Sequence, residues 1–235
     1  MQLLNRSGLW VTGGFILGFD AETEGIFEQQ IRFIEAAAIP WAMISFLHAV
    51  PRTALHDRMK KEGRLHEASV YNSDSTPPNF RTALPSVVLL RGFQIILTSI
   101  YAPKKFYERA LRSLQNWESR DCQRPAHQPT LGSIFKIMLR SFWHQGLLSS
   151  YRGAYWKFFL QVISRYATNR AKLWMGATLL VSGHHFIPYA REVVRQVEGE
   201  ILKIESEPQP VPSGSTEWKT TTCPSVSKSL LPSGR

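Results

Sequence analysis

Cysteine is scarce in this chain of 235 residues, which has only Cys122 and Cys223. They lie about a hundred residues apart, so they form neither a disulfide framework nor a local metal-ligand motif. Long apolar runs are also missing: the longest, residues 173–183, has about eleven residues, whereas a membrane-spanning helix needs roughly twenty. Residues 1–20 lack the continuous apolar stretch of a signal peptide. We therefore expect a protein of a reducing compartment, without a transmembrane helix.

Acidic residues are few in the second half of the chain. Between Tyr101 and Lys203, sixteen Lys and Arg residues outnumber six Asp and Glu residues by ten, which equals the formal net charge of +10. A basic surface of this kind favours negatively charged partners such as anionic lipids or nucleic acid. Apolar residues make up 43% of the chain, which is enough for a folded core.

The first part of the chain predicts a β-α-β unit. An apolar run without helical period covers residues 9–19 and is followed by Asp20, as is typical of a strand buried on both faces. Residues 24–38 form an amphipathic helical pattern, and residues 41–49 form a second apolar run, with a short helix expected at 54–62. This order implies a parallel sheet with a right-handed crossover. Two strands alone would leave their faces and edges uncovered, so we expect this part to depend on a partner.

From Pro85 onward the periodicity is helical. Six helices are expected, over residues 86–99, 104–118, 131–145, 151–166, 171–182 and 188–204. After Glu205 the chain is too rich in proline, serine and threonine to order itself. The sequence thus divides into an α/β part at 1–66, a loop linker at 67–85, a helical domain at 86–204 and a disordered tail at 205–235, and it is mostly α overall.

Four segments of the sequence resemble one family. They are GGFILGFDAET, the stretch from FEQQ to EGRL, NSDSTPPNF, and IYAPKKFYERALRSL. Together they are similar to the cobalamin-binding radical S-adenosylmethionine (SAM) proteins that include the hopanoid C-2 methylases. The resemblance spans roughly residues 4–114 and extends more loosely to residue 189. It implies that residues 1–66 are the last part of a TIM-like radical SAM barrel, followed by the family's C-terminal helical domain of unknown function.

The resemblance gives the first strand a role. In the family, a strand of the form G-x-I-x-G-x-x-x-E-T lies beside the adenosyl group of SAM, and the matching residues here are Gly14, Ile16, Gly18, Glu22 and Thr23. Glycine lets the backbone approach a ligand without a Cβ in the way. The alternative is that the glycines only permit close packing of strand and helix. The matching Glu-Thr pair, helix and second strand favour the SAM-facing interpretation.

The exit of the second strand is the other candidate site. The family has P-G-T-x-L there, and this chain has Pro51-Arg52-Thr53-Ala54-Leu55, so an arginine stands where glycine is usual. A backbone that needed positive φ at residue 52 would be strained. Barrel sites form at the carboxyl ends of the strands, which makes His48 and Arg52 substrate-side candidates. A strand-end histidine that only binds backbone is the alternative for His48.

The three closely spaced cysteines that hold the family's [4Fe–4S] cluster are absent from this sequence. Three thiolates leave one iron open, and there SAM is chelated and receives the electron that cleaves it. We therefore expect no catalytic residue, no metal site and no cofactor in this chain alone, whereas the full-length family uses SAM, the cluster and cobalamin. His184 and His185 do not suggest a metal site, because adjacent helical side chains point about 100° apart.

Aromatic and basic residues alternate in the later helices. The aromatic residues are Trp143, Tyr151, Tyr155, Trp156, Phe158, Phe159, Tyr166 and Trp174; the basic ones are Arg140, Arg152, Lys157, Arg165, Arg170 and Lys172. One interpretation is a set of amphipathic helices on an anionic membrane surface. Nucleic acid is a rival partner, disfavoured because no nucleic-acid module is recognisable. The plain alternative is an aromatic core with a solvated basic face.

Two functional hypotheses remain. The first is the C-terminal fragment or a subunit of a cobalamin-dependent radical SAM enzyme, methyltransferase-like and acting on a lipid or other apolar substrate. It would need a missing N-terminal half that carries the cobalamin and cluster domains. The second is a non-catalytic, membrane-peripheral or protein-binding helical module. Under either hypothesis we expect a cytoplasmic protein, which the membrane interpretation would place at the inner face of the membrane.

Overall fold

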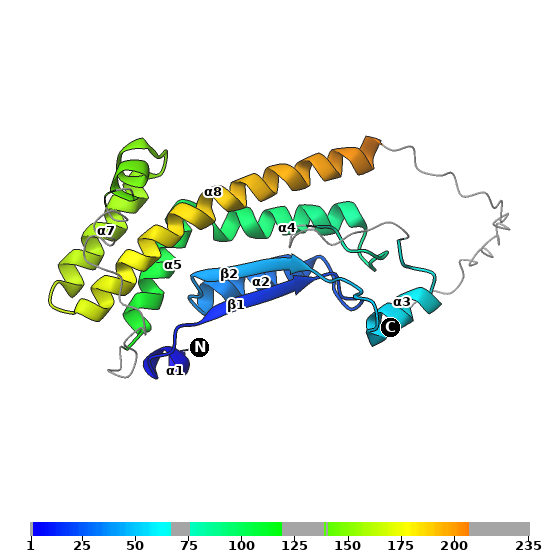
Figure 1. The fold of residues 1–235 in the computed structure, drawn as a ribbon, viewed down its shortest axis with the longest axis horizontal. Helices are drawn as coiled ribbons and strands as arrows, with labels where there is room; N and C mark the ends of the chain where they lie inside the picture. The colour runs from blue at the N-terminus through cyan, green and yellow to red at the C-terminus, as the bar shows by residue number, and fades with distance from the viewer. Residues whose placement is uncertain (1, 67–75, 119–138, 140, 207–235) are drawn as a thin grey trace, which may run out of the picture.

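A computed structural model describes residues 2–66, 76–118, 139 and 141–206 (Figure 1). Residues 67–75 of the predicted linker, most of the helix expected at 131–145, and the predicted tail from residue 207 onward lie outside the described residues. Cys122 and Cys223 lie outside them as well.

The N-terminal part forms the expected β-α-β unit. Strand β1 (Thr12–Leu17), helix α2 (Gly25–Ala36) and strand β2 (Trp41–Phe46) follow one another, and the strands pair in parallel from Thr12 beside Trp41 to Leu17 beside Phe46. Helix α3 (Ala54–Lys61) comes next, and a short helix, α1 (Gln2–Arg6), precedes the sheet without having been predicted. Both strands are shorter than their apolar runs, because those runs continue into the turns at the strand ends.

The remaining described elements are helical, so the mostly α composition is confirmed. They are α4 (Ser86–Ile100), α5 (Pro103–Asn116), the π-helix η1 (Phe142–Leu148), α7 (Arg152–Tyr166) and α8 (Arg170–Ser206). Among the described residues, no single helix is both long and apolar enough to cross a membrane. Only α4 and α5 together, bent by 63° at their junction, reach that length and composition.

One prediction about the helices is wrong. The helices expected at 171–182 and 188–204 are a single helix, α8, which contains Pro188 and includes the first two residues of the predicted tail, Glu205 and Ser206. Buried residues recur at helical spacing on both sides of the proline: Leu180, Gly183, Ile187, Ala190, Val193, Val197 and Ile201. Packing of this continuous apolar stripe against α4 and α5 therefore outweighs the roughly 3 kcal/mol by which proline disfavours a helix interior.

One hydrophobic core joins the sheet to the helices. In Figure 1, α4 lies between α8 and the sheet. The rings of Phe46 in β2 and Phe93 in α4 are 4.6 Å apart, and those of Tyr101 and Phe186 stack at 5.6 Å. The β-α-β unit is thus covered on one face by the chain's own helices, which corrects the expectation that both faces would be bare. The boundaries drawn at residues 66 and 86 stay predictions.

A buried arginine links the same two parts of the chain. Arg109 of α5 has no exposed surface, and its guanidinium donates to Glu35 Oε1 at 2.6 Å, to the carbonyl of Ile39 at 2.8 Å and to that of Ile100 at 2.7 Å. Arg112 binds the other carboxylate oxygen of Glu35 at 2.6 Å. Burial lowers the pKa of Arg109, and the adjacent Glu35 carboxylate opposes that shift. The end of α2 is therefore fixed to α5 by charge-assisted hydrogen bonds.

Candidate functional site

One face of the two-stranded sheet is open. Side chains alternate between faces along a strand, and Thr12, Gly14 and Ile16 of β1 are all exposed, next to Met43 of β2. Ile16 is 44% and Met43 58% exposed, and a Cβ added to Gly14 would meet nothing within 4 Å. A parallel sheet ordinarily has both faces covered. Here the described helices cover the face of Ala42, Ile44 and Phe46. The predicted SAM-facing residues Gly14 and Ile16 lie on the other face, where Trp41, at the start of β2, is half-buried against Trp10.

The loop after β1 is shaped by Gly18 and Glu22. Gly18 has φ of +111°, a conformation that side chains disfavour, and its N–H donates to Glu22 Oε2 at 2.7 Å. Burial raises the pKa of Glu22, while the N–H groups of Gly18 and Phe19 act against this rise. The carbonyl of Thr23 accepts the N–H of Ile26 at the start of α2. Glu22 and Thr23 therefore hold the turn that connects β1 to α2.

The loop after β2 contains both substrate-side candidates. The two ring nitrogens of His48 lie 2.9 Å from the carbonyl oxygen of Phe46 and 3.1 Å from that of Pro77. The ring thus binds backbone, as the alternative interpretation of His48 has it. Arg52 has φ of +71°, the left-handed conformation in which an arginine is strained. Thr53 follows as the N-cap of α3, and its Oγ1 accepts the N–H of His56 at 3.3 Å.

Both loops meet at the carboxyl end of the sheet. A Cβ added to Gly18 would lie 3.6 Å from Leu47 and 3.5 Å from Thr82, so three segments distant in sequence converge there. Asn79 joins them: its Oδ1 accepts the N–H of Ala49 at 2.8 Å and its Nδ2 donates to the carbonyl of Ala49 at 3.0 Å. Sequence reasoning did not single out Asn79, although it lies within the segment NSDSTPPNF that carried part of the family resemblance.

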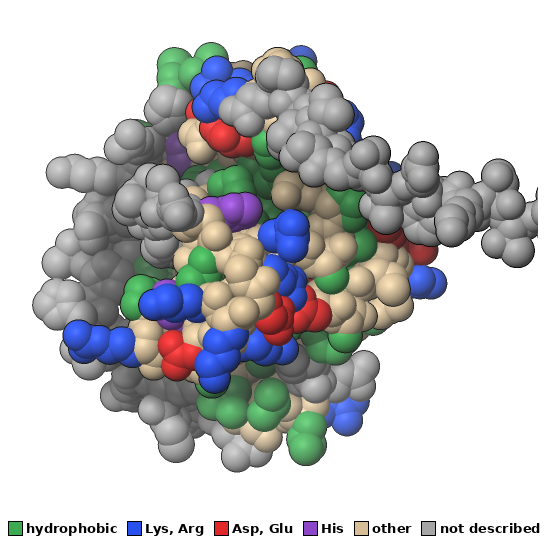
Figure 2. Space-filling model, turned by 90° about the vertical axis from the view of Figure 1, so that its right-hand side faces the viewer, with side chains coloured by type: hydrophobic (Ala, Val, Ile, Leu, Met, Phe, Trp, Pro, Cys, Tyr) green, Lys and Arg blue, Asp and Glu red, His purple; other side chains and the backbone are tan. Residues whose placement is uncertain are grey.

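An ion-pair cluster fixes α3 and the chain after it to this end. Asp20 accepts hydrogen bonds from Arg58 at 2.8 Å and from Arg64 at 2.6 Å, and Arg64 also binds Glu62 at 3.0 Å. The hydrogen bond from Arg64 holds the pKa of Asp20 below its ordinary value. Figure 2 looks onto this end and shows Lys and Arg side chains gathered around a few acidic ones. The cluster was not predicted, because its members lie far apart in the sequence.

Metal binding has little support in the described part of the chain. There, no three His, Cys, Asp or Glu side chains lie close enough together to hold one ion. A cluster site with three thiolates would also need three cysteines, and the whole sequence has two.

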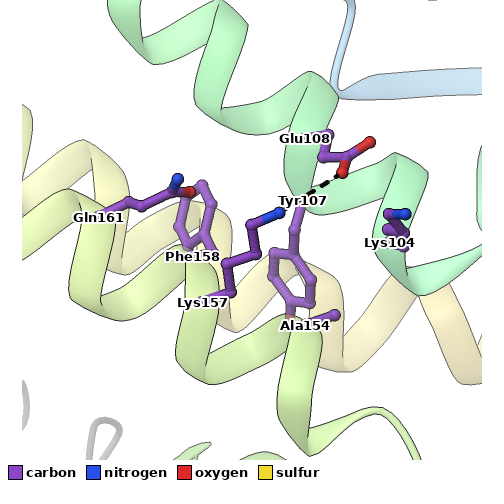
Figure 3. Close-up of a pocket in the computed structure, with 7 residues that line it drawn as sticks. All are labelled: Lys104, Tyr107, Glu108, Ala154, Lys157, Phe158 and Gln161. Atoms are coloured by element: carbon purple, nitrogen blue, oxygen red, sulfur yellow. Dashed lines mark ion pairs between the residues drawn. The ribbon is translucent and has the colours of Figure 1, made fainter.

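Two hollows in the described part of the chain lie away from the strand ends. One, between α5 and α7, is lined by Tyr107, Phe158 and the ion pair of Lys157 with Glu108 at 3.9 Å (Figure 3). Its volume is about 20 Å³, room for little more than a water molecule. Another, of about 360 Å³, lies where the α4–α5 corner meets α8 and is lined mainly by apolar residues with Arg191 at its border. Neither contains a predicted site residue.

Comparison with known proteins gives one family and two relatives. Residues 53–199 match the family described as Domain of unknown function (DUF4070). The chain is 31% identical over 199 residues to an uncharacterized methyltransferase of Synechocystis sp., a match that covers 84% of this chain and 36% of the relative. It is 29% identical over 199 residues to a hopanoid C-2 methylase of Rhodopseudomonas palustris, covering 83% of this chain and 36% of that protein. No solved structure matches the chain.

Proposed function

Because this chain belongs to the DUF4070 family, we propose that it is the C-terminal part of a larger radical SAM methyltransferase and provides one wall of the SAM site. The matched relatives are a methyltransferase and a hopanoid C-2 methylase, and the chain spans 36% of the length of each. A fragment or subunit of such an enzyme accounts for both facts.

The open face of the sheet is the observation that carries the proposal. A β-α-β unit with helices on one face only is what the end of a TIM-like barrel would look like, with its inner face uncovered once the other strands are taken away. Gly14 and Ile16 lie on that face, where the family resemblance places the adenosyl group of SAM. The edge of β1 away from β2 offers the next strand a row of backbone groups, since the sheet has only two strands among the described residues.

The residues present fit SAM but do not fit its cluster. Gly14 leaves open space above the strand for a planar group, and the Gly18–Glu22 turn fixes the loop at its end. SAM, when bound at a reduced cluster, supplies the radical or methyl chemistry. This chain would hold the adenosyl side in place and exclude water from it. The three thiolates, and the cobalamin domain, have to come from the upstream part of the enzyme.

The substrate we propose is apolar and of the lipid class. The support is the name of one relative, hopanoid C-2 methylase. His48 is bound to the carbonyls of Phe46 and Pro77, so its proposed part on the substrate side is to position the β2 exit loop. Arg52 lies in the same loop, four residues after His48, and its side chain is exposed to solvent.

The test is a chimera in which this chain replaces the matching residues of the Synechocystis methyltransferase. With an intact cluster domain, the chimera should cleave SAM under reducing conditions, as followed by chromatography of the products. Gly14→Val should lower the cleavage rate at least tenfold, because its branched side chain would fill the space that we assign to the adenosyl group. The matched control is Gly153→Ala in α7, where an added Cβ also meets nothing within 4 Å.

Equal rates for the Gly14→Val chimera and its control would contradict the proposed SAM wall. A folded chimera with a loaded cluster and no SAM cleavage would favour the alternative, a non-catalytic helical module. The exposed apolar residues on η1 and α7 support that alternative.

A further inference from the structure

The middle of the chain contains no acidic residue. Between Asp121 and Glu192 there is neither Asp nor Glu, whereas the same stretch has nine Lys and Arg residues. Its described part comprises η1, α7 and the first half of α8. No acid within the stretch can pair with these cations, and of the described ones Lys157 pairs with Glu108 of α5, so the stretch keeps a positive potential.

Apolar side chains are exposed on the same elements. We call the following residues the η1–α7 apolar surface: Phe142, Trp143, Leu147, Leu148, Leu160 and Ile163. Trp143 is 57%, Leu148 67% and Leu160 60% exposed. By contrast, two other aromatic residues of the predicted membrane set, Tyr155 and Phe158, are buried in the core. The plain alternative of an aromatic core therefore holds for only some of these residues.

Half-buried rings connect the two halves of this surface. Trp156 of α7 lies edge-on against Phe142 of η1 at 5.3 Å, and its indole N–H donates to the carbonyl of Gly146 at 3.0 Å. Trp156 also contacts Phe159 at 5.6 Å, and Leu160 and Ile163 follow at helical spacing on α7. The exposed residues thus form one patch instead of scattered single side chains, and patches of this kind mark interaction sites.

Exposed cations lie on the same elements as the patch. Arg152 begins α7, Arg165 lies in its last turn and Arg170 begins α8, and all three are exposed. Long basic side chains can lay their methylene groups on apolar surface while the charge stays in water. The hollow between α5 and α7 has a volume of about 20 Å³. It is too small for the buried aromatic or arginine anchors on which protein partners rely.

We propose that the η1–α7 apolar surface docks onto an anionic lipid bilayer. Indole rings, aliphatic side chains and exposed cations, in a stretch that has no acidic residue of its own, are the combination that an amphipathic element at the lipid headgroups requires. A bilayer also needs no pocket. In Figure 1, η1 and α7 lie at the opposite end of the molecule from the carboxyl ends of β1 and β2, so a bilayer bound there leaves the candidate site uncovered.

The experiment is sedimentation of the full chain with large vesicles. Vesicles of phosphatidylglycerol and phosphatidylcholine in equal parts should bind the chain, and pure phosphatidylcholine vesicles should bind it at least about tenfold more weakly. Binding should fall in ~0.5 M salt, where charges are screened beyond about 4 Å. The combined variant Trp143→Ser, Leu148→Ser and Leu160→Ser should weaken binding about tenfold or more.

The matched control changes exposed apolar residues elsewhere. Ile95 on α4 and Leu202 on α8 are 57% and 58% exposed, and Ile95→Ser with Leu202→Ser should leave vesicle binding unchanged. Circular dichroism and the urea midpoint check that all variants fold. This test does not depend on the proposed catalytic role, since no turnover is measured.

Three outcomes would overturn the inference. The first is equal binding by the combined variant and wild type, and the second is equal binding to both kinds of vesicle. The third is that the chain does not bind vesicles and the patch serves another partner. In that case the wild type would form a dimer that the combined variant converts to a monomer, or it would bind single-stranded RNA.

Discussion

At Arg52, the backbone conformation is one that favours glycine over a residue with a side chain. Its φ of +71° lies in the left-handed region, which costs a residue with a side chain roughly 1 kcal/mol or more relative to glycine. The sequence predicted strain if the position needed positive φ, because glycine is usual there in the family, and the structure has that conformation. Arg52 is exposed, so no buried contact offsets the strain.

We predict that Arg52→Gly raises the free energy of unfolding by about 0.5–1 kcal/mol, since part of the gain is lost to the greater freedom of glycine in the unfolded chain. Urea denaturation followed by circular dichroism measures it. Arg52→Ala is the control, because it removes the guanidinium but keeps the steric problem. If Arg52→Ala stabilised the protein as much as Arg52→Gly, charge and not backbone strain would be the cause.

The residues that sequence reasoning missed have partners far away in the chain. Asn79 binds Ala49 across 30 positions, and Asp20 binds Arg58 and Arg64 across 38 and 44. No local motif encodes such pairs. Gly14 and Ile16 were predicted from the resemblance to the family's strand motif, and because side chains alternate along a strand, they share one side of the sheet.

At the scale of elements, the contact of α2 with α4 depends on Gly92. A Cβ at this position would lie 2.2–2.4 Å from ring atoms of Phe27, closer than packed atoms can approach. We predict that Gly92→Ala destabilises the protein by about 1–3 kcal/mol through overpacking, although alanine favours the helix itself by about 1 kcal/mol. The unfolding midpoint in urea reports the sum.

Gly199 in α8 is the matched helical control. An added Cβ there meets nothing within 4 Å, so Gly199→Ala should stabilise the protein by about 0.5–1 kcal/mol. A stabilising Gly92→Ala would mean that α2 moves aside at little cost and that the helices are less tightly packed than the structure has them.

Periodicity predicted most elements but not how they end or join. Apolar spacing gave both strands and the helices α2, α3, α4, α5 and α7 with bounds within a few residues, since each has a buried face that repeats at its own period. It failed at Pro188, because the proline rule is local whereas the buried stripe of α8 continues on both sides. The π-helical form of η1 has no sequence signal that we recognise. Which face of the sheet the helices cover depends on contacts between distant parts of the chain, which periodicity does not predict.

At the scale of the whole molecule, a buried charge links the sheet to the helices. Arg109 satisfies Glu35 of α2, the carbonyl before β2 and the carbonyl that ends α4. The β-α-β unit and the helices therefore share a core and an ion pair, and we expect a single cooperative unfolding transition. Residues 1–66 should then be no more sensitive to protease than the helices, apart from the open face.

We predict that Arg109→Met lowers the free energy of unfolding by about 3–5 kcal/mol, because it leaves the carbonyls of Ile39 and Ile100 unpaired and Glu35 short of a partner. Arg112, which binds the same carboxylate, has a 49% exposed side chain, so Arg112→Met should cost no more than about 1 kcal/mol. In limited proteolysis, only Arg109→Met should open residues 9–65 ahead of residues 86–118. Equal losses in the two variants would contradict the prediction, because they would mean that the buried guanidinium holds the sheet to the helices no more strongly than the exposed one.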